Sequence, residues 1–229
     1  MFKNKHLLVI VPQRGVNASK SRLTSVLTDV ARGKLNRWLL ARTVGVVAAW
    51  LGDAQRCVVV SPCEVTLALA RKAGAVALPE QAATTGLNAA LSQAAAHAAA
   101  LGAERLLILP CDLPRLDVAA LEAMDTLQAV GNEVVIAPDR YYQGTNALLV
   151  DASVRKFAFG KDSFARHLAQ GDARRVRSFP CLNAALAFDL DTAQDFAEWT
   201  NSDDVPQDFL ATLPRVAPRG VGVISSRTK

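Results

Sequence analysis

Three aspartates have the setting of metal ligands. Asp112 lies in P-C-D-L-P, directly after a buried apolar run, and Asp189 and Asp191 lie two residues apart in D-L-D-T. In an extended segment, residues two apart point to the same side, so both carboxylates can face one cation. Together the three predict a site for Mg²⁺, which prefers oxygen ligands and often bridges a protein to substrate phosphates. For Asp191 alone, the alternative is that it caps a helix beginning at Thr192.

A basic loop follows the first apolar run. The segment V-P-Q-R-G-V-N-A-S-K-S-R-L places Arg14, Lys20 and Arg22 among glycine and serine residues. Such cations, followed by a helix N-terminus, can surround a polyphosphate with charge and backbone N–H groups. The alternative is a solvated basic loop. Neither G-x-G-x-x-G nor G-x-x-x-x-G-K-[ST] occurs, which excludes the dinucleotide fingerprint and the P-loop.

A further loop has residues suited to a nucleotide. Glu80 follows an apolar run, and Gly86 with Asn88 stands at the start of a helical stretch. An amide at that place can bind a base or a ribose. The alternative is an Asn/Gly turn that only starts the helix.

Two more loops offer an anion cradle. G-T-N-A-L contains Thr145, and F-G-K-D-S-F contains Gly160 and Ser163. Hydroxyl and N–H groups near a helix start can hold a phosphate or a carboxylate. Ser163 has an alternative role as the cap of its helix.

The remaining reactive residues do not assemble into a site. The histidines are dispersed, and the cysteines show neither C-x-x-C spacing nor a zinc-type Cys/His cluster. No G-x-S-x-G occurs, so nucleophilic serine or cysteine chemistry is not indicated. These residues are His6, His97, His167, Cys57, Cys63, Cys111 and Cys181.

The elements that must position these loops alternate between strand and helix. Strands are expected at 7–11, 56–61, 75–78, 105–109, 133–137, 144–150, 176–179 and 186–190. Helices are expected at 28–51, 64–73, 87–101, 118–129, 162–170 and 192–200. This order predicts an α/β fold with a parallel doubly wound first half and a mixed sheet afterwards. Ligands of such sheets bind beyond the carboxyl ends of the strands, where the loops above lie.

Composition limits the class of protein. The chain has 229 residues, 51% hydrophobic and 21% charged, with a net charge of +5. We expect one domain over 1–200 and a basic tail with proline and glycine over 201–229. The tail is expected to be extended, and the alternative is a disordered end. The longest apolar runs fall short of a membrane span, so a cytoplasmic protein is expected. The positive charge is spread along the chain, which favours an anionic small-molecule ligand over nucleic acid.

Read together, these motifs resemble those of the CofC/FbiD family, the guanylyltransferases of coenzyme F420 biosynthesis within the MobA-like nucleotidyltransferases. The resemblance runs from Leu7 to about Trp199. It is carried, in order, by K-S-R-L, S-P, L-P-E, G-L-N-A-A, P-x-D-L-P, A-P-D-R, G-T-N-A-L, F-G-x-x-S-F-x-R-H and D-x-D-T. It implies a Rossmann-like nucleotidyltransferase fold of the GT-A/MobA type, a three-layer sandwich with a mixed sheet.

The resemblance also implies roles for the candidate residues. Lys20 and Arg22, with Arg14, would lie near the triphosphate of GTP, and Glu80 and the loop of Gly86 and Asn88 near guanine. The three aspartates would bind Mg²⁺, with Lys20, Arg22 and Asp112 taking part in catalysis. The residues that would hold the phosphorylated acceptor are Thr145, Gly160 and Ser163.

Two departures from the family pattern bear on the acceptor. Arg14 stands where the family commonly has lysine, and Cys111 replaces the usual alanine of P-A-D-L-P. Family members use 2-phospho-L-lactate, phosphoenolpyruvate or 3-phospho-D-glycerate. Cys111 and the polar run of Tyr141, Tyr142 and Gln143 favour the hydroxyl-bearing 3-phospho-D-glycerate.

The expected reaction is GMP transfer from GTP to such an acid, with release of pyrophosphate. The alternatives are another MobA-like or sugar-phosphate nucleotidyltransferase, although the first loop lacks their G-x-G-x-R, and a non-catalytic nucleotide-binding protein, which would need no set of three aspartates. A homodimer is also expected, with Phe209, Leu210 and Leu213 packing on a second subunit.

Overall fold

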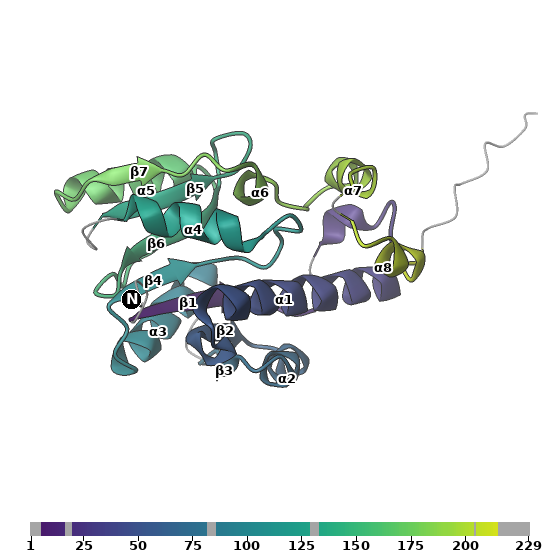
Figure 1. The fold of residues 1–229 in the computed structure, drawn as a ribbon, viewed down its shortest axis with the longest axis horizontal. Coiled ribbons are helices and arrows are strands. Elements are labelled where there is room, and N and C mark those ends of the chain that lie inside the picture. The colour runs from purple at the N-terminus through teal and green to yellow at the C-terminus, as the bar shows by residue number, and fades with distance from the viewer. Residues whose placement is uncertain (1–5, 17–19, 82–85, 129–132, 204, 215–229) are drawn as a thin grey trace, which may run out of the picture.

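The computed structural model describes residues 6–16, 20–81, 86–128, 133–203 and 205–214. Seven strands form one sheet in the order β3-β2-β1-β4-β6-β5-β7 (Figure 1). The strands are β1 (Leu7–Pro12), β2 (Cys57–Ser61), β3 (Val76–Pro79), β4 (Arg105–Ile108), β5 (Val134–Pro138), β6 (Thr145–Asp151) and β7 (Ser178–Pro180). The helices are η1 (Ser21–Leu23), α1 (Asp29–Leu51), η2 (Ala54–Arg56), α2 (Glu64–Lys72), α3 (Leu87–Ala100), α4 (Val118–Leu127), α5 (Ser163–Ala173), α6 (Ala184–Ala187), α7 (Ala193–Thr200) and α8 (Gln207–Ala211).

The sheet is mixed, as the sequence predicts. β1 lies parallel to β2 and β4, and β3 lies parallel to β2. β6 runs antiparallel to both of its neighbours, β4 and β5, while β7 is parallel to β5. Because β6 is reversed, it begins at the edge where β1 and β4 end. The first residue of β6, Thr145, therefore belongs to the same edge as the loop that contains Asp112.

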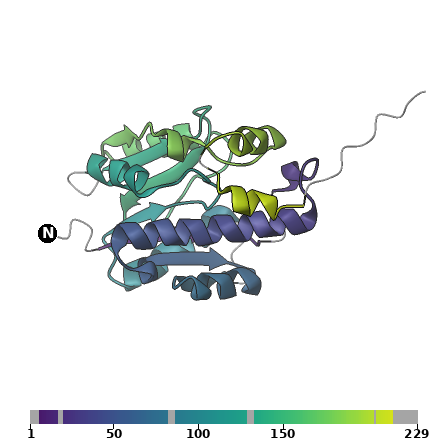
Figure 2. The ribbon, with the colours of Figure 1, turned by 45° about the vertical axis from the view of Figure 1, so that its right-hand side comes forward.

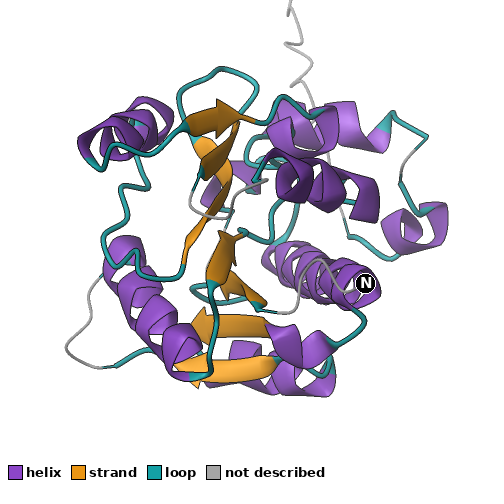
Figure 3. Cartoon of the chain, turned by 60° about the vertical axis from the view of Figure 1, so that its left-hand side comes forward, coloured by secondary structure: helices purple, strands orange, loops and turns teal. Residues whose placement is uncertain are grey.

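Helices cover both faces of the sheet, which confirms the three-layer sandwich (Figure 3). The core on one face joins α1, α2, α4 and α6 to the strands, and the core on the other face joins α3 and residues around α5. β2 and β5 are buried along their whole length, and β4 is buried after Arg105, as expected for strands covered on both faces. None of the described helices has the length and apolar character needed to cross a membrane.

The long helix α1 has clear end signals. The hydroxyl of Thr28 accepts a hydrogen bond from the backbone N–H of Ala31, 3.2 Å away, and Gly52 ends the helix with φ of 74°. The first half of α1 packs in a third apolar cluster with α7 and residues near α8. In Figure 2, α8 lies along α1.

The strand expected at 186–190 is wrong. Residues 184–187 form the short helix α6 instead, because the side chain of Asn183 accepts hydrogen bonds from the backbone N–H groups of Ala185 and Leu186. Only Leu186, Phe188 and Leu190 point inward in this segment. These three residues are spaced two apart, as in a strand. In an apolar run this short, the spacing does not distinguish a strand from a helix.

The start of the expected tail is also packed rather than extended. The ring of Phe209 in α8 stacks on Trp38 of α1 with centroids 4.9 Å apart, and Leu213 is 5% exposed. Phe209, Leu210 and Leu213 therefore pack on their own chain. Whether the chain also forms the expected homodimer stays a prediction. Apolar side chains near the end of a domain fill the nearest uncovered apolar surface, here that of α1. The rest of the expected tail, 215–229, lies outside the described residues.

Candidate functional site

The side chain of Lys20 joins three loops that are far apart in the sequence. Its Nζ lies 3.8 Å from Oδ2 of Asp112 and 3.7 Å from Oδ1 of Asp191, and donates a hydrogen bond of 2.5 Å to the backbone oxygen of Leu190. The Lys20 side chain is only 6% exposed. The basic loop and both aspartate motifs therefore meet at the carboxyl edge of the sheet, as predicted.

The aspartates lie close enough for their charges to alter the ionisation of Asp189 and Asp191. Burial, together with the neighbouring charges of Asp112 and Asp191, raises the pKa of Asp189 to about 6. Burial and Asp112 also raise the pKa of Asp191, whereas Lys20 and Arg22 lower it. The cluster therefore concentrates negative charge and favours a bound cation.

A preformed cage of three metal ligands is not present in the part of the chain that the structure describes. The described residues therefore do not show the expected geometry, in which three carboxylates surround one ion. The donor set nevertheless fits Mg²⁺, because this ion commonly takes only one or two carboxylates and completes its shell with substrate phosphates and water. Asp112 with Asp189 or Asp191 meets that requirement once phosphates are bound.

Asp191 does not cap the following helix. Thr192 is the N-cap of α7, and its side chain accepts a hydrogen bond from the N–H of Asp195 while the Asp195 carboxylate accepts from the N–H of Thr192. The Asp195 carboxylate also accepts from the N–H of Asp191. The capping alternative is therefore wrong, and the carboxylate of Asp191 is left to the site.

Two residues that the sequence analysis did not single out hold Asp189 in place. The guanidinium of Arg140 lies over the ring of Phe188 and donates 3.1 Å hydrogen bonds to the backbone oxygen of Asp189 and to Oδ1 of Asp195. Asn146 donates to Oδ1 of Asp189 at 3.4 Å. Both residues stand in motifs quoted above, A-P-D-R and G-T-N-A-L, but only the fold brings them to Asp189.

The residues expected near the nucleotide lie in facing loops. Burial raises the pKa of Glu80, and the charge of Arg14 opposes this rise, so the first loop lies near the loop after β3. Arg14 and Arg22 are exposed. Gly86 precedes α3 with φ of 90°, a conformation that side-chain-bearing residues rarely adopt.

The amide of Asn88 links the expected nucleotide loop to the expected acceptor loop. Its Nδ2 donates to the backbone oxygen of Phe159 at 3.1 Å, and its Oδ1 accepts from the Phe159 N–H at 2.9 Å. Gly160 follows with φ of 112° and is exposed. Asn88 therefore does more than start α3: it positions Gly160 beside the start of that helix.

The expected acceptor residues Thr145 and Ser163 are buried. Ser163 is the first residue of α5, and the N-cap is Asp162, which makes no side-chain capping bond. The capping role of Ser163 is therefore wrong. The hydroxyl of Thr145 lies 2.9 Å from Nδ1 of His167, which belongs to α5. This contact holds α5 to the first residue of β6.

Cys111 does not face the candidate site. Its side chain is 5% exposed and belongs to the core under α1 and α4. Burial raises the pKa of its thiol to about 12, so the group stays neutral. Cys111 therefore gives no support for recognition of an acceptor hydroxyl. Tyr141 and Tyr142 are exposed, so their hydroxyls remain open to a ligand.

Comparison with known proteins identifies the family. Residues 7–214 match the family described as guanylyl transferase CofC like. The chain belongs to this CofC-like family. It is 37% identical over 200 residues to a phosphoenolpyruvate guanylyltransferase of Rubrobacter xylanophilus, covering 87% of this chain and 96% of that protein. It is 35% identical over 193 residues to a 3-phospho-D-glycerate guanylyltransferase of Phenylobacterium zucineum, covering 82% and 87%.

Solved structures confirm the fold of this CofC-like protein. A nucleotidyl transferase from Methanothermobacter matches with a TM-score of 0.58 at 14% identity, over 91% of this chain and 99% of that one. A cytidylyltransferase from Leptospira borgpetersenii matches with a TM-score of 0.57 at 14% identity, over 90% and 92%. The CofC-like chain therefore has a nucleotidyltransferase fold along almost its whole described length.

Proposed function

We propose that this protein transfers GMP from GTP to the phosphate of a phosphorylated three-carbon acid, with release of pyrophosphate, in coenzyme F420 biosynthesis. The observation that carries the proposal is the contact of Lys20 with Asp112 and Asp191 at the carboxyl edge of the sheet. A buried ammonium beside carboxylates suits a site that must hold both polyphosphate and a cation.

The reaction needs positioning and charge neutralisation rather than a covalent intermediate. An oxygen of the acceptor phosphate attacks the α-phosphorus of GTP, and the bond from that phosphorus to the bridging oxygen of pyrophosphate breaks. Lys20, Arg22 and Arg14 neutralise the triphosphate. A phosphate dianion is already a competent nucleophile, which accounts for a candidate site built without a histidine base.

Asp112, Asp189 and Asp191 are the residues that would hold Mg²⁺. When bound, Mg²⁺ would supply positive charge that neutralises phosphate oxygens. Arg140 and Asn146 keep Asp189 oriented toward this position. The ammonium group of Lys20 lies against two of these carboxylates, those of Asp112 and Asp191.

Substrate recognition is shared between two linked loops. Glu80, Gly86 and Asn88 lie on the nucleotide side, and Gly160 follows the residue that Asn88 holds. Thr145 and Ser163, at the start of β6 and of α5, offer hydroxyls to the phosphate or carboxylate of the acceptor.

For the acceptor, relatives are named for phosphoenolpyruvate and for 3-phospho-D-glycerate. We favour 3-phospho-D-glycerate, because the exposed Tyr142 and Gln143 next to the acceptor loop can pair with its hydroxyl. Incubation with 2-phospho-L-lactate, phosphoenolpyruvate and 3-phospho-D-glycerate at equal concentrations, with products separated by mass, tests this choice. A dominant phosphoenolpyruvate product contradicts it and leaves the transfer reaction itself unaffected.

The reaction is tested by pyrophosphate release from GTP with each acid, with and without Mg²⁺. ATP, CTP and sugar 1-phosphates serve as comparison substrates. We expect release only with GTP, Mg²⁺ and a three-carbon acid. Release with a sugar phosphate would instead identify a sugar-phosphate nucleotidyltransferase, and GTP binding without release would identify a binding protein.

A further inference from the structure

A cavity of about 360 Å³ lies between α5, the strands β5 and β6, and the loop that follows β6. Four side chains provide its apolar wall: Val134, Leu148, Val150 and Val154. A cavity of this volume is in the range of sites for small organic ligands. The proposed transfer reaction does not use it.

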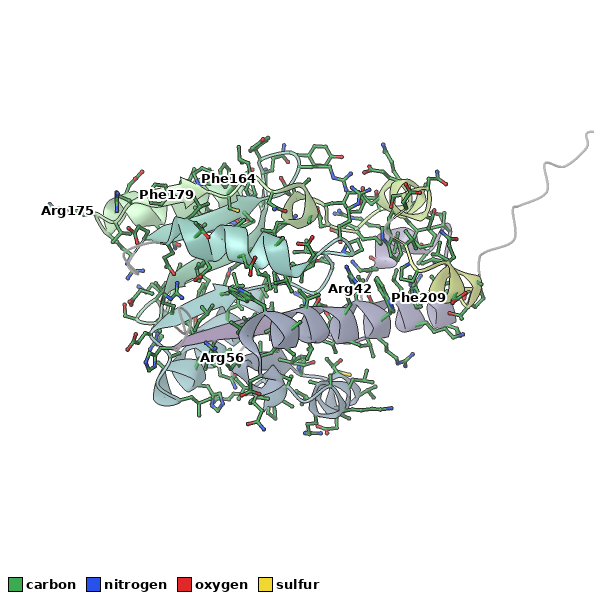
Figure 4. The ribbon with its side chains drawn as sticks, in the orientation of Figure 1. Arg42, Arg56, Phe164, Arg175, Phe179 and Phe209 are labelled. Carbon is green, nitrogen blue, oxygen red and sulfur yellow. The ribbon has the colours of Figure 1, made fainter. Side chains whose placement is uncertain are left out.

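The cavity opens at the edge of the sheet opposite to the candidate active site. Val150 pairs with Leu106 near the start of β4, whereas Asp112 follows the end of that strand. In Figure 4, Arg175, two residues after the end of α5, lies at the other end of the molecule from Phe209 of α8. A ligand in this cavity would therefore not occupy the place of the nucleotide.

The mouth of the cavity is cationic. Arg155, Lys156 and Arg174 line it, all three are exposed, and none of the described residues of its lining carries a carboxylate. Arg155 donates to the backbone oxygens of Ala152 and Val154, and Arg174 to the hydroxyl of Ser153. These bonds orient the cations without neutralising them, since none of the three forms an ion pair with another described residue.

His167 forms the inner end of the cavity and carries no charge there. Its Nε2 accepts a 3.2 Å hydrogen bond from the backbone N–H of Ala158, so its Nδ1 carries the proton and donates to Thr145. Burial lowers the pKa of His167 to about 4. The positive charge available to a ligand therefore lies at the mouth alone, and the interior is uncharged.

We propose that this cavity is a second binding site, which takes a carboxylate with a short hydrocarbon chain. The chain would contact the valine and leucine wall, and the carboxylate would lie at the mouth among Arg155, Lys156 and Arg174. Burial of the chain favours binding, while the cations exclude ligands with a positive head. The uncharged interior next to His167 excludes a doubly charged anion that lacks an apolar part.

Octanoate is the probe that tests this site, added to the full chain at neutral pH. Calorimetry is expected to show one saturable site per chain, and NMR a shift of the His167 ring signals. Octan-1-ol is expected to bind about tenfold more weakly, since it lacks the charge. Acetate, which lacks the hydrocarbon chain, is expected not to shift the His167 signals.

Octyl phosphate tests the choice of a carboxylate over a phosphate. If octyl phosphate bound more tightly than octanoate, a carboxylate ligand would be contradicted. Equal binding of octanoate and octan-1-ol, or no shift of His167, would overturn the proposal.

Variants at the mouth locate the binding. Arg174→Gln and Lys156→Gln are each expected to weaken octanoate binding about fivefold, as for the loss of one partly exposed charge. Lys72→Gln, which removes an exposed cation on α2, is the matched control and is expected to change nothing. Ala173→Trp places a large ring at the mouth from an exposed position, so the fold should persist. Unchanged octanoate binding by a folded Ala173→Trp variant would also overturn the proposal.

Discussion

The hydroxyl of Thr145 and Nδ1 of His167 lie 2.9 Å apart and join the first residue of β6 to α5. The other ring nitrogen of His167 accepts from the backbone of Ala158, and the ring lies edge-on to Phe159 at 4.8 Å. A neutral imidazole satisfies both hydrogen bonds, but an imidazolium cannot accept one. The acceptor loop is therefore held by a histidine that must stay unprotonated.

This requirement predicts a loss of stability in acid. Burial lowers the pKa of His167 in the folded chain from 6.5 to about 4. Between these values the unfolded chain binds more protons, so the free energy of unfolding falls as pH falls through this window. We expect a loss of about 3 kcal/mol between about pH 7 and about pH 4 from this group.

Urea unfolding across this pH range measures the effect. His167→Gln is expected to be less stable at neutral pH but to lack this component of the pH dependence. His6→Gln, at an exposed position, is the control and should keep the wild-type slope. If the free energy of unfolding of His167→Gln depended on pH as steeply as that of the wild type, the pH dependence would not come from His167.

Removal of a site carboxylate should abolish most activity without unfolding the chain. Asp112→Asn, Asp189→Asn and Asp191→Asn are each expected to lower turnover by at least about a hundredfold, because each removes a charge from the proposed Mg²⁺ position. The readout is Mg²⁺-dependent pyrophosphate release, with circular dichroism to check folding. Asp208→Asn on α8 is the control, and its turnover should be unchanged. Near-normal activity of Asp112→Asn or Asp189→Asn would show that the proposed metal position is wrong.

Arg140 should matter for turnover through Asp189 rather than by touching a substrate. Arg140→Gln loses hydrogen bonds to the Asp189 backbone and to Asp195, and we expect about tenfold lower kcat. The KM for GTP should change little, and raising the Mg²⁺ concentration should restore part of the activity. Arg71→Gln, which breaks a surface ion pair with Glu64, is the control. A rise in KM alone would instead indicate a direct substrate contact.

Much of this arrangement could be predicted from the sequence, and the failures have physical causes. Short buried strands such as β1, which ends at Pro12, and β4, which ends two residues before Pro110, have strong local signals, so the α/β order and the edge that carries the site were predictable. The contact of Lys20 with Asp191 spans 171 positions and depends on tertiary packing. The segment after Cys181 has strand-like spacing, but the capping side chain of Asn183 turned it into a helix. The helix α8 was not predicted either, because its five residues are too few to show a helical pattern in the sequence.

The packing of α8 on α1 predicts a measurable contribution to stability. Phe209→Ala removes the ring that stacks on Trp38, and we expect a loss of about 2 kcal/mol in the free energy of unfolding, since Phe209 is only partly buried. Leu182→Ala, at a side chain that is 69% exposed, is the control and should change stability by less than about 0.5 kcal/mol. Equal effects of the two substitutions would show that α8 does not hold α1 in solution.

The contact between α5 and β7 predicts a rescue by double substitution. A Cβ added at Gly171 would lie 2.0 Å from Oγ of Ser178, and that Oγ is buried without a hydrogen-bond partner among the described residues. Ser178→Ala alone should leave stability unchanged or raise it, because it removes an unsatisfied hydroxyl. Gly171→Ala alone should cost about 1–3 kcal/mol through overpacking.

In the double variant the clashing oxygen is absent and the next nearest atom, the Cβ of residue 178, is 3.4 Å away. Thermal unfolding of the four proteins should therefore show a favourable coupling of about 1–2 kcal/mol. Strictly additive effects would mean that the two residues do not touch.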